Sequence, residues 1–140
     1  MIKHLATYQH KITEIVDRAE NLIGGRERPS PLTLGKTRWA LARALNEYQV
    51  FKHSRIFDPI LAQEHGPRAE LARSQREACM ALGAEYRTYV AHWNAVDILD
   101  RWEDYRSAAL AMLARIRGHV QDETAAFARL DAMPEERKAA

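Results

Sequence analysis

Glycine and proline interrupt this chain at only a few places, and the segments between the interruptions are long runs of strong helix formers. No window alternates apolar and polar residues with the period of two that a half-buried strand requires. The breaks lie at Gly24-Gly25, Pro29, Pro31, Gly66-Pro67 and Pro134. This pattern predicts an all-α chain made of four long helices.

The expected helices run from about Ile2 to Ile23, from about Thr37 to Ala62, from Pro67 to about Asn94, and from a cap at Asp97 to about Met133. A connection of 12 residues, from Gly25 to Lys36, joins the first two helices. The other connections are short, which favours antiparallel neighbours. We therefore expect residues 1–140 to form one antiparallel four-helix bundle domain.

Charge and composition exclude several classes of partner. The chain has 21 basic and 19 acidic residues mixed along its length, so no concentrated positive patch for nucleic acid is expected. No apolar run approaches the roughly 20 residues that span a bilayer, and no membrane role is expected. The N-terminus lacks the apolar core of a signal peptide, and the single cysteine, Cys79, cannot form an internal disulfide. These features predict a cytoplasmic protein.

One pair of residues has a spacing suited to metal chemistry. His119 and Glu123 are four apart in the fourth expected helix, so both lie on one face, one turn apart. Phe127 and Leu130 continue that face as an apolar stripe, which places the pair at the margin of the core. Helical bundles bind metals through side chains that project inward at this spacing.

The sequence His119-Val-Gln-Asp-Glu123, followed by Phe127 and Leu130, resembles the last helix of hemerythrin-like, or HHE, cation-binding domains. The resemblance covers the whole chain in the number and length of helices, but the motif is complete only in the fourth helix. It implies a bundle with a second helix of the same kind, a single histidine on each of the other two helices, and a pair of irons inside.

The other helices depart from the family pattern at the ligand positions. In the second helix, Gln49 stands where the resemblance implies a histidine and His53 where it implies a carboxylate. Gln9 in the first helix and Gln75 in the third occupy the remaining histidine positions. A neutral amide oxygen is a weak ligand for iron, zinc or manganese compared with imidazole or carboxylate.

The candidate metal ligands are therefore His53, His119 and Glu123, with Gln9, Gln49 and Gln75 as weak ligands or as hydrogen-bond partners of the ligands. Two histidines and one carboxylate suffice for one Fe, Zn or Mn ion with open positions. They do not suffice for an oxygen-carrying di-iron pair, which is not expected.

Three functions fit these residues. The first is a hemerythrin-like cation-binding protein with at most one metal ion and a sensing or storage role. The second is a metal-free module that binds an unknown protein partner or forms a homodimer. In this module, glutamine, histidine and tyrosine side chains form a buried polar network. The third and weakest is a mononuclear oxidoreductase. No enzyme motif is present, so an enzymatic function is not the favoured hypothesis.

The remaining histidines and Cys79 have simpler explanations. The histidines lie near helix ends or off the inward stripes and are expected on the surface. Cys79 is expected to be a small core residue, because no base is evident beside it. Tyr48 precedes a ligand-position glutamine and could form a hydrogen bond into the site. The four surface histidines are His4, His10, His65 and His92.

Overall fold

The computed structural model describes residues 3–139, and within them it is helical without a β-strand. The helices are α1 (Leu5–Gly24), α2 (Pro31–Lys52), α3 (Asp58–Gln63), α4 (Pro67–Asn94) and α5 (Trp102–Ala132). A π-helical segment, His53–Phe57, joins α2 to α3 without a break in the chain's helical course. The prediction of an all-α chain is confirmed.

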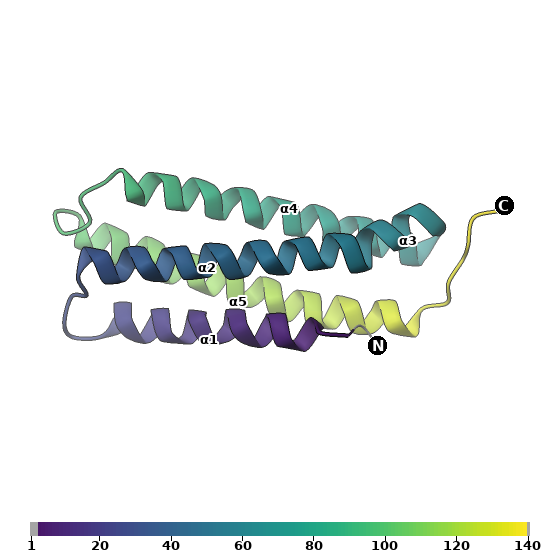
Figure 1. Ribbon diagram of the computed structural model, residues 1–140, viewed down its shortest axis with the longest axis horizontal. Helices are drawn as coiled ribbons and strands as arrows, with labels where there is room; N and C mark the ends of the chain where they lie inside the picture. The colour runs from purple at the N-terminus through teal and green to yellow at the C-terminus, as the bar shows by residue number, and fades with distance from the viewer. Residues whose placement is uncertain (1–2, 140) are drawn as a thin grey trace.

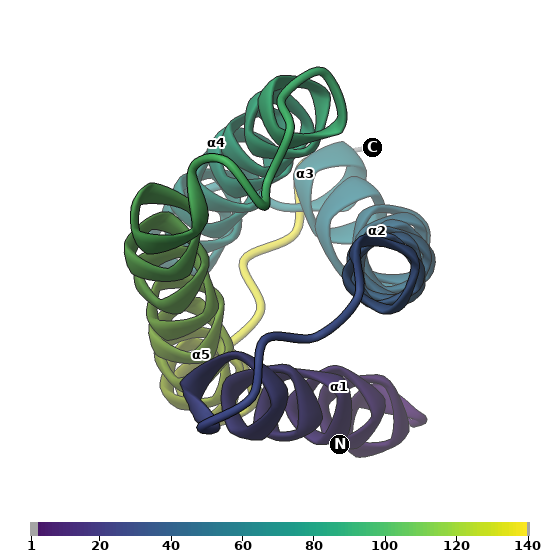
Figure 2. The same ribbon diagram turned by 90° about the vertical axis from the view of Figure 1, so that its left-hand side faces the viewer.

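The four long helices lie side by side, and consecutive ones run in opposite directions (Figure 1). Helix α1 packs against α2 and α5, and α4 packs against the same two helices from the other side (Figure 2). The C-terminal segment turns back over the end of the molecule, where Lys138 N donates to Gln63 O and His65 N donates to Glu136 O. In the described part of the chain, no helix is long and apolar enough to cross a membrane.

Helix α2 begins six residues earlier than the sequence predicts, at Pro31 rather than Thr37. Ser30 caps it, because its Oγ accepts a hydrogen bond from Thr33 N at 3.1 Å. Pro31 fits the first helical position, where no amide hydrogen is needed and the fixed φ suits a helix. The prediction of a loop as far as Lys36 was therefore wrong, since Pro31 starts the helix instead of interrupting a connection.

Helix α5 begins four residues later than predicted, with Arg101 instead of Asp97 at the cap position and Trp102 as its first residue. Asp97 does not cap it, because Asp97 Oδ1 accepts from Leu99 N at 3.1 Å within the connecting turn. The turn is held against the rest of the molecule by Ile98, which is buried. The short-range hydrogen bond of the aspartate thus defines a turn and not a helix start.

The π-helical segment changes which face of the second helix is buried. The buried residues of α2 include Tyr48 and Lys52, one position before the Gln49 and His53 that the sequence pattern places inward. From Ile56 onward the predicted and observed buried positions agree. Three successive steps of four residues, from Tyr48 through Lys52 and Ile56 to Ile60, exceed the period of an α-helix, and the wider π turn accommodates the difference.

The core consists of two apolar clusters with polar side chains between them. The larger cluster includes Tyr48 and Val120, and the smaller includes Ile56 and Phe127. On α5, Glu123 lies between Val120 and Phe127, and it is fully buried. On α2, Lys52 occupies the equivalent place between Tyr48 and Ile56 and is 2% exposed. The candidate site is therefore a polar layer between the two apolar clusters of the interior.

Candidate functional site

The centre of the polar layer is an ion pair between Lys52 on α2 and Glu123 on α5. Lys52 Nζ donates to Glu123 Oε2 at 2.7 Å, and neither side chain has appreciable contact with solvent. Removing two charges from water costs several kcal/mol for each ion, and only close geometry offsets that cost. The short distance and the opposite charges explain how both groups can be ionised here.

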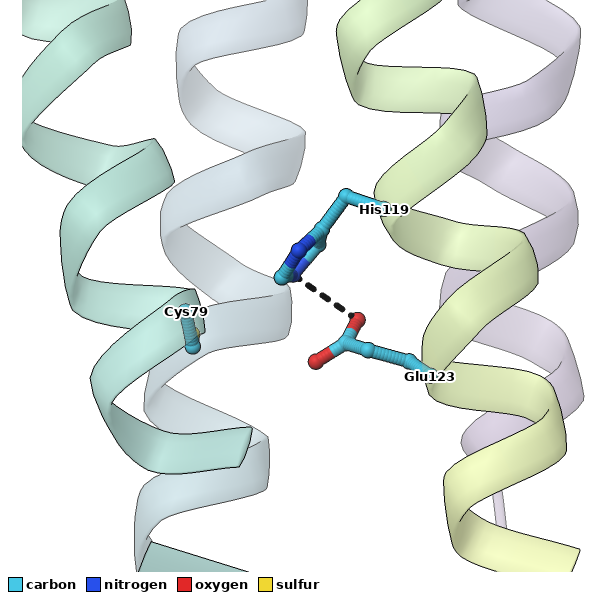
Figure 3. A group of neighbouring side chains, drawn as sticks. All are labelled: Cys79, His119 and Glu123. Carbon is cyan, nitrogen blue, oxygen red and sulfur yellow. Dashed lines mark ion pairs between the residues drawn. The ribbon is translucent and has the colours of Figure 1, made fainter. Parts of the chain in front are cut away.

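His119 lies one turn before Glu123 and faces the same carboxylate (Figure 3). His119 Nε2 is 3.2 Å from Glu123 Oε1, and both residues are buried. The pair does not meet the geometry of a hydrogen bond, so both atoms lack a hydrogen-bond partner in the described chain. Buried polar atoms normally have partners, and a bound water or ion is one explanation for two facing atoms without one.

Cys79 on α4 completes a group of three ligand-type side chains. The nearest donor atoms of Cys79, His119 and Glu123 all lie within 4.8 Å of one another, and all three residues are buried (Figure 3). A cavity of about 20 Å³ is lined by Cys79 and His119 of this group, and it also contacts Tyr48, Gln49 and Lys52. A volume of this size holds a single water-sized species.

The electrostatics of the site follow from burial and from the lysine. Burial would raise the pKa of Glu123, but contact with His119 and the charge of Lys52 outweigh it, and the pKa lies below the usual value. Burial raises the pKa of the Cys79 thiol, although nearby Lys52 opposes that effect. The carboxylate is therefore ionised and the thiol protonated before any cation binds, and a metal ion would have to displace the thiol proton.

Tyr48 connects Lys52 to the first helix. The ammonium of Lys52 lies 3.9 Å from the centre of the Tyr48 ring, which is a cation–π contact. Gln9 Nε2 on α1 donates to the Tyr48 hydroxyl at 3.0 Å. Burial raises the pKa of Tyr48, so the hydroxyl stays neutral. Through these contacts the polar layer involves α1, α2, α4 and α5.

The structure brings together some of the predicted ligands and separates others. His119 and Glu123 face each other, whereas His53 lies outside the group of three, on the π-helical segment. The His53 ring meets Phe57 edge-on at 5.4 Å, and its Nε2 is buried without a hydrogen-bond partner in the described chain. Burial, followed by the charge of Arg76, lowers the pKa of His53.

The three glutamines take different positions. Gln9 binds Tyr48 as described above, and Gln49 lines the cavity, where its Oε1 lies close to Gly83. Gln75 is half-buried on α4. The hydrogen bond of Tyr48 is with Gln9, as the metal-free alternative predicts, and all four histidines expected on the surface are exposed.

Two residues of the site were missed by sequence reasoning. Cys79 was read as a core residue, although it lies on the inward face of α4 and is the one cysteine of the chain. Lys52 was not among the candidate site residues, and a lysine is rarely buried without a partner. The available signal was the apolar spacing of Leu41, Ala44 and Tyr48, which continues to Lys52 at helical intervals.

Comparisons with protein-family models, with curated proteins and with solved structures found no match. A functional assignment therefore depends on the geometry of the polar layer.

Proposed function

We propose that the protein is a hemerythrin-like antiparallel four-helix bundle that binds one transition-metal ion through Cys79, His119 and Glu123. The observation that supports this proposal best is the buried group of three donor atoms within 4.8 Å, in which His119 Nε2 and Glu123 Oε1 have no hydrogen-bond partner. The proposal keeps His119 and Glu123 from the sequence-based ligand set and replaces His53 with Cys79.

The donor set favours zinc over the hard cations. A thiolate, an imidazole and a carboxylate are ligands that Zn²⁺ accepts together, and three protein ligands leave one coordination position open. Iron and manganese are the other candidate ions; the resemblance implies iron, and manganese prefers oxygen ligands. A bound metal ion would supply positive charge and Lewis acidity, and Cys79, His119 and Glu123 would hold it at a buried position.

A pair of irons does not fit the residues present. Gln9, Gln49 and Gln75 offer only neutral amides where the family pattern implies imidazoles. The ammonium of Lys52 already contacts Glu123, and its charge opposes a second cation nearby. We therefore propose a mononuclear site.

The small volume of the site favours sensing as the role. A cavity of about 20 Å³ has no room for an organic substrate beside an ion. The three proposed ligands lie on α4 and α5. Lys52, which forms an ion pair with the ligand Glu123, lies on α2. Metal occupancy would therefore change the contacts between three helices, which is what a sensor requires.

Metal content tests the proposal directly. Protein purified without an affinity tag is loaded with zinc, desalted and measured by elemental analysis, together with the variants His119→Ala, Cys79→Ser and His53→Ala. About one equivalent is expected in the wild type and in His53→Ala, and little in the other two. The exposed His92 provides a matched control, and His92→Ala is expected to retain the metal.

Other outcomes distinguish the alternatives. Loss of the ion in His53→Ala would show that His53 is a ligand after all. Two equivalents of metal in the wild type would contradict the mononuclear site. Replacement by Co²⁺ gives a second readout, because a thiolate ligand adds an intense near-ultraviolet absorption that Cys79→Ser should remove. No uptake of any of these metals would reject the proposal.

A metal-free interaction module is the second candidate, and an exposed apolar surface on α2 favours it. Leu32 and Trp39 are 69% and 70% exposed, and a separation of seven residues places them on one face of the helix. A second copy of the chain is the occupant we would test, by light scattering after gel filtration. A dimer that Trp39→Ser abolishes, in protein that takes up no metal, would support this candidate.

A further inference from the structure

Arg38 on α2 is a buried cation away from the polar layer. Its side chain is 8% exposed, Nη1 donates to the Tyr105 hydroxyl at 3.2 Å, and Nη2 donates to Asn94 Oδ1 at 3.1 Å. The guanidinium also lies over the Tyr105 ring, 5.6 Å from its centre. Arg38 Nε makes no hydrogen bond within the described chain. Every hydrogen-bond partner of this charge is a neutral group.

The charge of Arg38 has no counter-ion among residues 3–139, since no carboxylate oxygen there lies within 4.0 Å of it. Lys52, the other deeply buried cation, is paired with Glu123. An arginine cannot lose its proton to escape the cost of burial, and an unpaired buried charge is costly. A counter-charge from outside the chain would remove that cost.

A cavity of about 20 Å³ lies beside Arg38, and the hydroxyl-bearing residues around it are Thr37, Tyr86, Tyr89 and Tyr105. The Thr37 hydroxyl donates to Thr33 O at 2.9 Å. Tyr86 donates to the Arg38 carbonyl at 3.0 Å. Tyr105 accepts from Arg38, so its own hydroxyl hydrogen is available to another acceptor. Burial raises the pKa of Tyr86 and of Tyr89, with the neighbouring Tyr105 contributing, so both are neutral. The rest of the wall is mostly apolar and comes from α1, α2 and α5.

We propose that this cavity binds a monatomic anion, chloride in physiological buffer, held by the Arg38 guanidinium and the Tyr105 hydroxyl. The volume suits one water-sized species, which excludes phosphate, sulfate and organic carboxylates. The mostly apolar wall suits a weakly hydrated anion that needs few donors. The site joins α2 to the end of α4 at Asn94 and to the start of α5 at Tyr105, so the anion would stabilise this end of the molecule.

Halide dependence of the wild-type protein is the first test. Thermal unfolding is followed in sodium chloride, in sodium bromide and in sodium gluconate at equal ionic strength, so that screening is constant. The melting temperature should rise with halide concentration and saturate, because a ligand of the native state stabilises it by mass action. Gluconate, which is too large for the cavity, should give no such rise.

Two variants and a diffraction measurement locate the anion. Arg38→Gln should abolish the halide-dependent rise, whereas Arg43→Gln, at an exposed arginine of the same helix, should retain it. Crystals soaked in bromide should give an anomalous peak beside Arg38 of the wild type, a result that does not require Arg38→Gln to fold. Equal melting in halide and gluconate, or a bromide-soaked crystal without that peak, would overturn the proposal. The test is independent of the metal site.

Discussion

The ammonium of Lys52 lies 2.7 Å from Glu123 Oε2 and 3.9 Å from the centre of the Tyr48 ring, so the protein places a positive charge of its own beside the proposed metal ligands. Glu123 belongs both to this ion pair and to the group formed with Cys79 and His119. A metal ion bound as we propose would therefore compete with the lysine for one carboxylate. This competition leads to the first two predictions.

Lys52→Met is expected to destabilise the metal-free protein by about 3–5 kcal/mol, because it leaves the carboxylate of Glu123 buried without a partner. Urea unfolding in the presence of a chelator measures this change. The double variant Lys52→Met, Glu123→Leu should recover most of the loss, since a buried ion pair can often be replaced by apolar groups of similar volume. If the double variant were less stable than the single one, the ion pair would not be the cause.

The same substitution is expected to tighten zinc binding on the order of tenfold or more. Two unit charges about 4 Å apart interact by roughly 4 kcal/mol at the effective dielectric of a protein, so removal of the ammonium removes a large repulsion. Competition with a chromophoric chelator measures the affinity, on protein shown by circular dichroism to be folded. Lys11→Met removes a lysine from an exposed ion pair with Glu47 and should leave zinc affinity unchanged. Weaker binding in Lys52→Met would show that the lysine supports the site.

The sequence identified the helical class because the signals for it are local. The Gly66-Pro67 break and the inward stripe of Ile12, Val16, Ala19 and Ile23 depend only on neighbouring residues, and the structure retains them. The start of α2 was misplaced because proline can either begin a helix or interrupt a loop. The choice depends on the cap that Ser30 provides.

The site was only half predictable for a related reason. The spacing of His119 and Glu123 is a property of one straight helix, so the sequence placed them together correctly. Lys52 and His53 are separated by the start of a π-helical segment, and an ideal period carried backward from Ile56 selects the wrong one of the two. Cys79 lies on another helix, and its approach to His119 depends on how the helices pack, which no local spacing reveals.

Acid should destabilise the protein partly through His53. Burial and the charge of Arg76 lower the pKa of this residue from its usual value of 6.5. As the pH falls below about 6.5, the unfolded chain binds the proton first, so the free energy of unfolding decreases until the folded protein also binds it. His53→Gln removes this contribution. Its unfolding free energy should therefore fall less between pH 7.5 and 5.5, and an equal decrease in both proteins would contradict the assignment.

A side chain at Gly66 is expected to destabilise the folded protein. It has φ 87° and ψ −163°, a backbone region almost confined to glycine, and a Cβ there would also collide with the Glu136 carboxylate. Gly66→Ala should cost about 1–3 kcal/mol in urea unfolding. Gly118→Ala is the matched control: a Cβ there meets nothing within 4 Å, and alanine is the better helix former, so a gain of about 0.4–1 kcal/mol is expected. Equal effects of the two substitutions would show that the backbone at Gly66 relaxes when a Cβ is added.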